Sequence, residues 1–372
     1  MGSKLDTLTQ KKPHYHALDG LRGVAALVIL IYHYLEMIYP GDNEANWLGH
    51  GYLAVDFFFC LSGFVVGYAY DDRMAKIGVW GFFQNRLIRL HPMVILGALL
   101  GFIGYLWDPF VVAAYPEIAF PGWGKIFGAL GLSLLLVPAP FLPYRWEAIS
   151  PYNSPAWSLF FEYIANIVYG LFLWRFNRKI LLGIGIVCAG WVLAVSYHGG
   201  KDPLIGGWDI GTVPDGFARV FFSFIAGLLV FRFKFIWKTR LGFMFPLVLL
   251  LGTFVLPHIN HDWFVESLLI ILIFPLILSV GAGTHVSGFW ERFCIFTGRL
   301  SYPLYMTHIT TVWIFGNYLT LHKPSTEVAT LCTIGLIIFN LVIGYLAMRF
   351  FDEPLRAWLG KWQKRILANS GK

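Results

Sequence analysis

The sequence has 372 residues, of which 57% are hydrophobic and 13% are charged. A soluble domain carries about a quarter of its residues as charged side chains, so this composition excludes an ordinary soluble protein. The net charge of +7 does not indicate nucleic-acid binding, because the lysines and arginines gather in short loops between apolar segments, where they report membrane topology. We therefore expect the lipid bilayer, and no nucleic acid, as a partner.

Apolar segments follow one another along the whole chain, most of them near the length of about twenty residues that a helix needs to cross a bilayer. They lie at 18–38, 51–70, 88–107, 124–139, 155–174, 180–197, 215–233, 241–257, 263–281, 300–320 and 327–350. The segment 124–139 is short, glycine-rich and bracketed by prolines. We interpret it as a re-entrant or interfacial piece, which leaves ten spans.

The basic loops support a count of ten. With ten spans, the loops RFNRK at 175–179 and RFKFIWKTR at 232–240 fall on the same side as the lysine-rich N-terminus. Cytoplasmic loops carry the excess of lysine and arginine. The sequence therefore predicts an all-α polytopic membrane protein of one domain, residues 1–372, in the plasma (bacterial inner) membrane. Its tails, 1–16 and 355–372, are expected to be cytoplasmic.

The first segment, LDGLRGVAALVILIYHY at 18–34, carries two polar residues, Arg22 and His33. Eleven residues of helix make three turns and about 20°, so both side chains share one face roughly 16 Å apart. Polar groups inside a span are functional-site candidates, because an unpartnered charge there is costly. The alternatives are an Arg22 that extends to the headgroups and a His33 that is a hydrogen-bonded core residue.

The stretch NRLIRLHP places Arg86 and Arg89 three residues apart at the cytoplasmic mouth of the third span. Two guanidinium groups on one helix face make a good clamp for phosphate. The alternative is that both are ordinary positive-inside charges.

Several other apolar segments contain polar or aromatic side chains that are candidate site residues. These are Asp56 and Ser62 in GYLAVDFFFCLSGF, Trp157 and Glu162 in SPAWSLFFEY, His308 in SYPLYMTH, and Asp352 and Glu353 in FFDEP. The alternative for FFDEP is a solvated helix end.

Four of these motifs in this order resemble the membrane acyltransferase-3 family. They are LDGLRG with its Arg-x10-His, FFFCLSGF, the Arg-x-x-Arg-x-x-Pro of 86–92, and the Trp-Ser-Leu-x-x-Glu of 157–162. The resemblance implies a ten-helix core that transfers an acyl group, often acetyl, from acyl-CoA to a hydroxyl of a glycan, lipid or antibiotic. Many relatives carry an esterase-like domain after the core, and we expect none here.

The resemblance also implies residue roles. Arg22 and His33 are the paired catalytic residues, and Arg86 and Arg89 help to hold the acyl-CoA. Ser62, Trp157 and His308 are further candidate acyl-CoA contacts, and His308 is also a second candidate base. No metal is expected.

In the mechanism that fits these residues, His33 deprotonates the acceptor hydroxyl as it attacks the thioester, and a covalent acyl-histidine is the variant. Glu162 and Asp56 are candidates to orient His33. Arg22 lies too far along the helix to touch His33, so it is better explained as an acyl-CoA or packing contact.

The alternative function is a transporter or flippase that lines a substrate path with the same arginine, histidine and aspartate side chains. Against it, the sequence shows no inverted repeats. The two functions differ in product, because transport makes no new ester.

Overall fold

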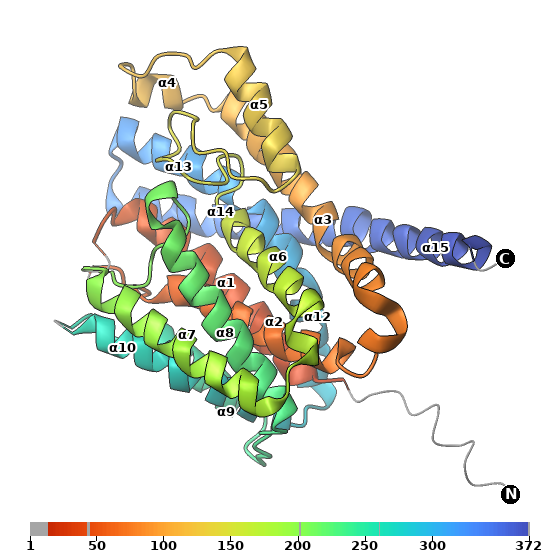
Figure 1. Cartoon of the computed structure of the whole chain (residues 1–372). Coiled ribbons are helices and arrows are strands. Elements are labelled where there is room, and N and C mark those ends of the chain that lie inside the picture. Colours follow the sequence, from red (N-terminus) through yellow and green to blue (C-terminus); the bar gives the residue numbers. More distant parts are fainter. Residues whose placement is uncertain (1–13, 43–44, 201, 260, 371–372) are drawn as a thin grey trace, which may run out of the picture.

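The apolar runs form helices, and no strand occurs within the residues that the computed structural model describes, 14–42, 45–200, 202–259 and 261–370. Figure 1 shows them as one helical body from which α15 projects. The longer helices are α1 (His16–Ile38), α2 (Ala54–Tyr70), α3 (Met74–Trp107), α5 (Trp123–Leu134), α6 (Ala156–Leu171), α7 (Arg178–His198), α8 (Val213–Arg232), α9 (Met244–Phe254), α11 (Phe274–Gly283), α12 (Gly288–Thr307), α13 (Ile309–His322), α14 (Thr326–Leu346) and α15 (Glu353–Ser370). The short ones are η2 (Gly51–Leu53), α4 (Val111–Ala114), η3 (Leu173–Arg175), η4 (Ile210–Thr212), α10 (Asp262–Leu268), η5 (Leu269–Ile273) and η6 (Ala347–Asp352).

Within the described residues, seven helical segments are long and apolar enough to cross a membrane. They are His16–Ile38, Gly51–Tyr70, Met74–Trp107, Arg178–His198, Ile210–Arg232, Asp262–Gly283 and Thr326–Ile366. Each contains or largely overlaps one of the ten expected spans, so the chain is a multi-pass, all-helical membrane protein. The count of ten and the cytoplasmic position of both ends stay predictions.

The other three expected spans differ from the helices that form. The segment 155–174 holds the 16-residue α6, and 241–257 holds the 11-residue α9. At a rise of about 1.5 Å per residue, α9 is too short to cross a hydrocarbon core of about 30 Å. The segment 300–320 is divided between α12 and α13 at His308.

The break at His308 has a local cause. Pro303 lies inside α12 and cannot donate a backbone hydrogen bond. The hydroxyl of Thr307 donates to the Pro303 carbonyl at 2.9 Å, and such side-chain bonds to a helical carbonyl bend helices. Sequence hydropathy does not register either effect, because the apolar pattern continues through the bend.

The segment 124–139 forms the 12-residue helix α5 followed by irregular chain, as expected for a piece that does not cross.

The end of the chain differs from expectation. The FFDEP stretch does not end the last helix, since α14, η6 and α15 are continuous from Thr326 to Ser370. The π-helical η6 ends at Asp352, two residues before Pro354, and changes the backbone hydrogen-bond spacing there, which lets the helix run on through a residue with no N–H.

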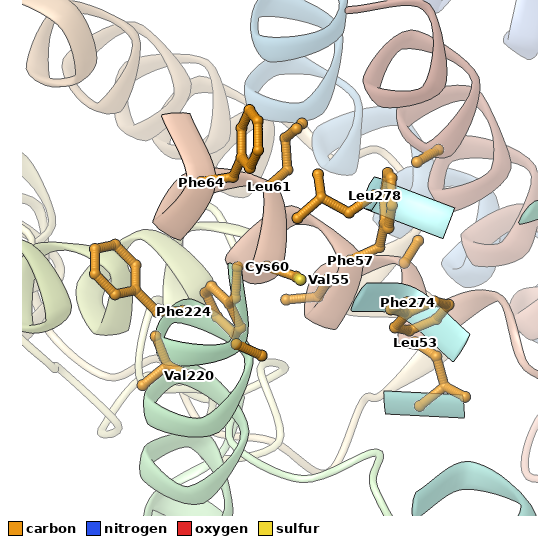
Figure 2. Close-up of a cluster of buried hydrophobic side chains, with 14 of the residues drawn as sticks. Leu53, Val55, Phe57, Cys60, Leu61, Phe64, Val220, Phe224, Phe274 and Leu278 are labelled. Carbon is orange, nitrogen blue, oxygen red and sulfur yellow. The ribbon is translucent and has the colours of Figure 1, made fainter. Parts of the chain in front are cut away.

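The core is built around two close helix pairs, α1 along α12 and α2 along α8. Figure 2 shows phenylalanine and aliphatic side chains of α2 packed against Val220 and Phe224 of α8 and against Phe274 and Leu278 of α11. Two glycines let α2 and α8 approach. A Cβ atom at Gly63 would lie 1.9 Å from the Phe224 carbonyl oxygen, and one at Gly227 would lie 1.8 Å from that of Cys60.

Because no side chain fits at this crossing, Gly227→Ala is expected to lower the free energy of unfolding by about 1–3 kcal/mol. A thiol-reactive dye that reports exposure of the buried Cys60, Cys188 and Cys294 on heating gives the unfolding temperature in detergent. Gly252→Ala is the matched control, since a Cβ there meets nothing within 4 Å. Equal unfolding temperatures for the two variants would contradict the close crossing.

Candidate active site

Two cavities lie at opposite ends of α1. The first has a volume of about 210 Å³, and we name it the arginine cavity. Its polar lining is Arg22, Ser62, Arg86, Arg89, Ser158, Glu162, Arg299, Ser301, Asp352 and Arg356. The second has a volume of about 330 Å³, and we name it the histidine cavity. Its polar and aromatic lining is Tyr32, His33, Glu36, Tyr52, Trp146, Ser154, Trp157, Trp208, Arg219, Tyr305 and Trp313.

The arginine cavity is net positive, because its lining holds five guanidinium groups and two carboxylates. Asp19 and Glu353 pair with two of these arginines, Arg22 and Arg299, from outside the lining. Arg86 donates to Glu162 at 2.6 Å, and Ser62 donates to the same oxygen at 2.7 Å. Arg356 pairs with Asp352 at 2.7 Å. Arg89 is exposed and has no hydrogen-bond or ion-pair partner among the described residues. The cavity therefore retains positive charge with which to bind an anion.

The side chain of Arg22 connects α1 to α12 through hydrogen bonds. Its guanidinium donates to the Ser301 hydroxyl at 3.0 Å, to the Gly298 carbonyl at 2.8 Å and to Asp19 at 2.9 Å. It lines the arginine cavity, whereas His33 lines the other one. This geometry fits a packing or ligand-contact role and gives Arg22 no contact with His33.

The histidine cavity presents an imidazole that is held by a carboxylate. The Nδ1 of His33 lies 3.0 Å from Glu36. An ionised carboxylate only accepts hydrogen bonds, so Nδ1 carries the hydrogen, and in the neutral imidazole Nε2 then has a lone pair. The His308 ring stacks on that of His33 with centroids 5.4 Å apart. The imidazole is thus oriented as a general base requires.

Four tryptophans from separate parts of the chain line the histidine cavity: Trp146, Trp157, Trp208 and Trp313. Arg145 packs against one ring of this aromatic lining, with its guanidinium carbon 4.0 Å from the Trp313 ring centroid. Burial lowers the pKa of Arg145 to about 10, which leaves the side chain charged at neutral pH.

Tyr305 separates the two cavities. It is the one side chain among the described residues that lines both. Its hydroxyl donates to the Pro155 carbonyl at 3.1 Å and lies 2.8 Å from the Ser158 hydroxyl.

The expectation that Glu162 or Asp56 orients His33 is corrected. Glu162 is bound by Arg86 and Ser62 in the arginine cavity. Asp56 lines neither cavity and forms a buried ion pair with Arg219, with nitrogen–oxygen distances of 2.6 and 3.1 Å. A guanidinium outcompetes an imidazole for a buried carboxylate because it is always charged and binds through two nitrogens.

The remaining predicted residues divide between the two cavities. Ser62, Arg86 and Arg89 come together in the arginine cavity. Trp157 lines the histidine cavity instead, because it faces the opposite side of α6 from Glu162. His308 lines neither cavity and is fully buried behind His33.

A family model described as an acyltransferase domain matches residues 15–349. The chain belongs to this acyltransferase-3 family. The resemblance predicted from four motifs is therefore confirmed over nearly the whole chain.

Curated relatives of this acyltransferase family are similar at moderate identity. Protein 2 in the picA locus of Rhizobium radiobacter is 37% identical over 44% of this chain and 84% of that protein. The acyltransferase MdmB of Streptomyces mycarofaciens is 30% identical over 44% of this chain and 40% of that protein. The peptidoglycan O-acetyltransferase OatA of Listeria monocytogenes is 23% identical over 94% of this chain, which spans 57% of that enzyme. No solved structure matches.

Sequence reasoning missed Glu36, Arg219 and Tyr305. Glu36 carried a signal, since residues three apart share a helix face and His33 was already a candidate. Arg219 was a lone charge in an apolar span, which marks either a site or a buried partner. Tyr305 stood in the same motif as His308, and nothing in the sequence places it between cavities.

Because Asp56 neutralises the fully buried Arg219, Asp56→Ala is expected to cost about 3–5 kcal/mol of unfolding free energy. Thermal unfolding in detergent checks this against Asp42→Ala, an exposed control. The double variant Asp56→Leu with Arg219→Met removes both charges and is expected to recover much of the loss. An unchanged unfolding temperature for Asp56→Ala would refute the structural role.

Proposed function

We propose that this protein is a membrane-embedded, acyl-CoA-dependent O-acyltransferase that moves an acyl group, first of all acetyl, to a hydroxyl of a glycan, glycolipid or similar acceptor. The observation that carries the proposal is the meeting, at Tyr305, of a cavity rich in arginine and a cavity that holds a carboxylate-bound histidine. Membership of an acyltransferase family supports the reaction class. The plasma membrane of a bacterium is the proposed location.

The donor binds in the arginine cavity. Coenzyme A carries phosphate groups, and guanidinium groups bind phosphate through paired, charge-assisted hydrogen bonds. Arg89 is free to make such bonds, and the Nε of Arg86 has no partner among the described residues. Positive-inside topology supports a cytoplasmic position for this cavity.

The pantetheine arm lies along the apolar part of the same cavity, where Phe58, Phe59 and Tyr302 contribute to the lining. Its thioester reaches the histidine cavity once the ring of Tyr305 moves aside. The length of this route is consistent with the separation of Arg22 and His33 by about three helical turns of α1, since Arg22 lines the donor cavity and His33 lines the cavity in which transfer takes place.

Transfer uses the lone pair on Nε2 of His33. This nitrogen takes the proton of the acceptor hydroxyl while the oxygen attacks the thioester carbon. The carbon–sulfur bond then breaks, and the proton passes from His33 to the departing thiolate of coenzyme A. Glu36 holds the imidazole and stabilises its positive charge between the two steps. In the variant with a covalent acyl-histidine, Nε2 attacks first and the acceptor hydroxyl attacks second.

The acceptor occupies the histidine cavity. Tryptophan rings offer apolar faces and an N–H donor to a mixed polar and apolar ligand, which suits a sugar. The printed name of the Listeria relative, a peptidoglycan O-acetyltransferase, supports a glycan. A transporter is the alternative, and formation of a new ester separates the two.

If His33 is the base, His33→Ala is expected to reduce acyl transfer by about 10²–10⁴-fold. The measurement is transfer of radiolabelled acetyl from acetyl-CoA to an acceptor by purified protein in bilayer nanodiscs. Glu36→Gln is expected to cause a smaller loss, because it keeps a weaker hydrogen bond to Nδ1.

His285→Ala, at an exposed histidine, is the matched control and should retain full activity. Equal transfer by His33→Ala and wild type would rule out His33 as the base. Consumption of neither acetyl-CoA nor longer acyl-CoA donors by wild type would favour the transporter.

If Arg89 binds a phosphate of the donor, Arg89→Ala is expected to raise the Kd for acyl-CoA about 10-fold, the value of one charge-assisted hydrogen bond. Calorimetric titration of purified protein with coenzyme A measures this. Arg73→Ala, an exposed arginine outside both cavities, is the control. An unchanged Kd for Arg89→Ala would show that Arg89 does not bind the donor and would leave it only a role in membrane orientation.

A further inference from the structure

Two histidines and two acids gather at the end of the molecule that holds the histidine cavity, outside that cavity. His50 lies directly before η2, His258 lies between α9 and α10, and Asp262 begins α10. One potential ligand atom from each of these three lies within 4.8 Å of the others. The two imidazole rings are stacked, with centroids 4.1 Å apart and planes 12° apart. Two segments that are distant in the chain, the one before η2 and the one around the start of α10, thus meet at one polar cluster.

The hydrogen bonds of this cluster fix which ring nitrogens carry hydrogen. The Nδ1 of His50 lies 3.0 Å from the Leu256 carbonyl oxygen, and the Nδ1 of His258 lies 2.6 Å from the carboxylate of Asp262. Both oxygens accept, so both Nδ1 atoms donate. In a neutral imidazole the other nitrogen then holds a lone pair, and both Nε2 atoms are acceptors.

Neither Nε2 atom has a hydrogen-bond partner among the residues that the structure describes. The side chains are deeply buried, with exposed fractions of 0% for His50 and 7% for His258. Leaving a buried acceptor without a partner costs about 1–3 kcal/mol. Two such acceptors on stacked rings form a site that a cation would satisfy.

A buried carboxylate lies near one of these lone pairs. Glu266 is fully buried, and its Oε1 lies 3.8 Å from the Nε2 of His50. Tyr52 donates to the same oxygen, and the backbone N–H of Leu204 donates to the other one. An imidazole whose Nδ1–H is held by a carboxylate or carbonyl is the usual arrangement of a metal-ligating histidine.

We propose that His50 and His258 bind a divalent transition-metal ion, Zn²⁺ in the first instance, together with a carboxylate of this cluster. Imidazole and carboxylate ligands suit zinc, at distances of about 2.0–2.2 Å. Two ligand atoms around one ion are then about 4 Å apart at most, so atoms within 4.8 Å of one another are near enough to share an ion. Because the two rings are stacked, 12° from parallel, binding also requires one imidazole to turn until both Nε2 lone pairs point at the ion. The expectation of no metal is replaced by this proposal.

The ion would act as a structural brace. It ties the segment after α1 to the connection between α9 and α10, beside Tyr52, which lines the histidine cavity. Among the described residues of these two connections, the hydrogen bond that joins them runs from the His50 side chain to the Leu256 carbonyl. The metal would add a second tie and so fix one wall of that cavity.

The test uses full-length protein purified with a tag that contains no histidine. After chelation and dialysis, equilibrium dialysis with Zn²⁺ is expected to give one tightly bound ion per chain, and the unfolding temperature is expected to rise by about 5 °C. X-ray absorption at the zinc edge of the wild type is expected to show nitrogen and oxygen ligands with the scattering pattern of two imidazoles.

His258→Leu is expected to lose the ion and the thermal shift. The double variant His14→Ala with His16→Ala is the matched control, because His14, His16 and Asp19 form a second, more exposed cluster of similar ligand atoms. This control variant should keep the bound ion and the thermal shift. Absence of bound zinc in the wild type, retention by His258→Leu, or loss in the control variant would each overturn the proposal. If His258→Leu does not fold, the X-ray absorption spectrum of zinc bound to the wild type tests the proposal instead. Sulfur ligands, or fewer than two imidazole ligands, would refute the site.

Discussion

The ion pair between Asp56 and Arg219 is the contact on which the rest of the active region depends. It joins α2 to α8 in the part of the protein where a lone charge would be most costly. The same guanidinium lies 5.2 Å from the ring centroid of Trp157 and donates to the carbonyl of Gly206 at 2.6 Å. One charge therefore holds the helix pair, the start of α6 and the connection before α8, and these elements line the histidine cavity together with α1 and α13.

The same rule of charge pairing explains how structural and ligand-binding arginines differ. Arg22 and Arg219 have their donors satisfied within the protein, whereas Arg89 does not. Composition cannot make this distinction, because each of these arginines stands in or beside an apolar run. The partners lie on other helices, so only the folded arrangement separates an arginine that holds the protein together from one that is available to a substrate.

Much of the fold could be predicted from the sequence, and less of the site. Hydropathy located the seven long helices because burial in lipid acts on each segment independently. It failed at His308, where side-chain hydrogen bonding and a proline bend an apolar run, and at Pro354, where a π-helical turn lets the helix continue. The motifs located His33 and Arg86, but the partner of Asp56 depends on which helices become neighbours, and a single sequence does not encode that as a local pattern.

The separation of the two cavities by Tyr305 has a consequence for the energetics of the cell. Under the proposed topology, a continuous water-filled route between them would let protons flow down the gradient that the membrane maintains. In the proposed reaction, the phenol ring tied to Ser158 and Pro155 would close that route while the donor site is empty, and the donor's own arm would fill it during transfer. The acyl group would then pass from one cavity to the other without coenzyme A leaving the arginine cavity and without an ion leak.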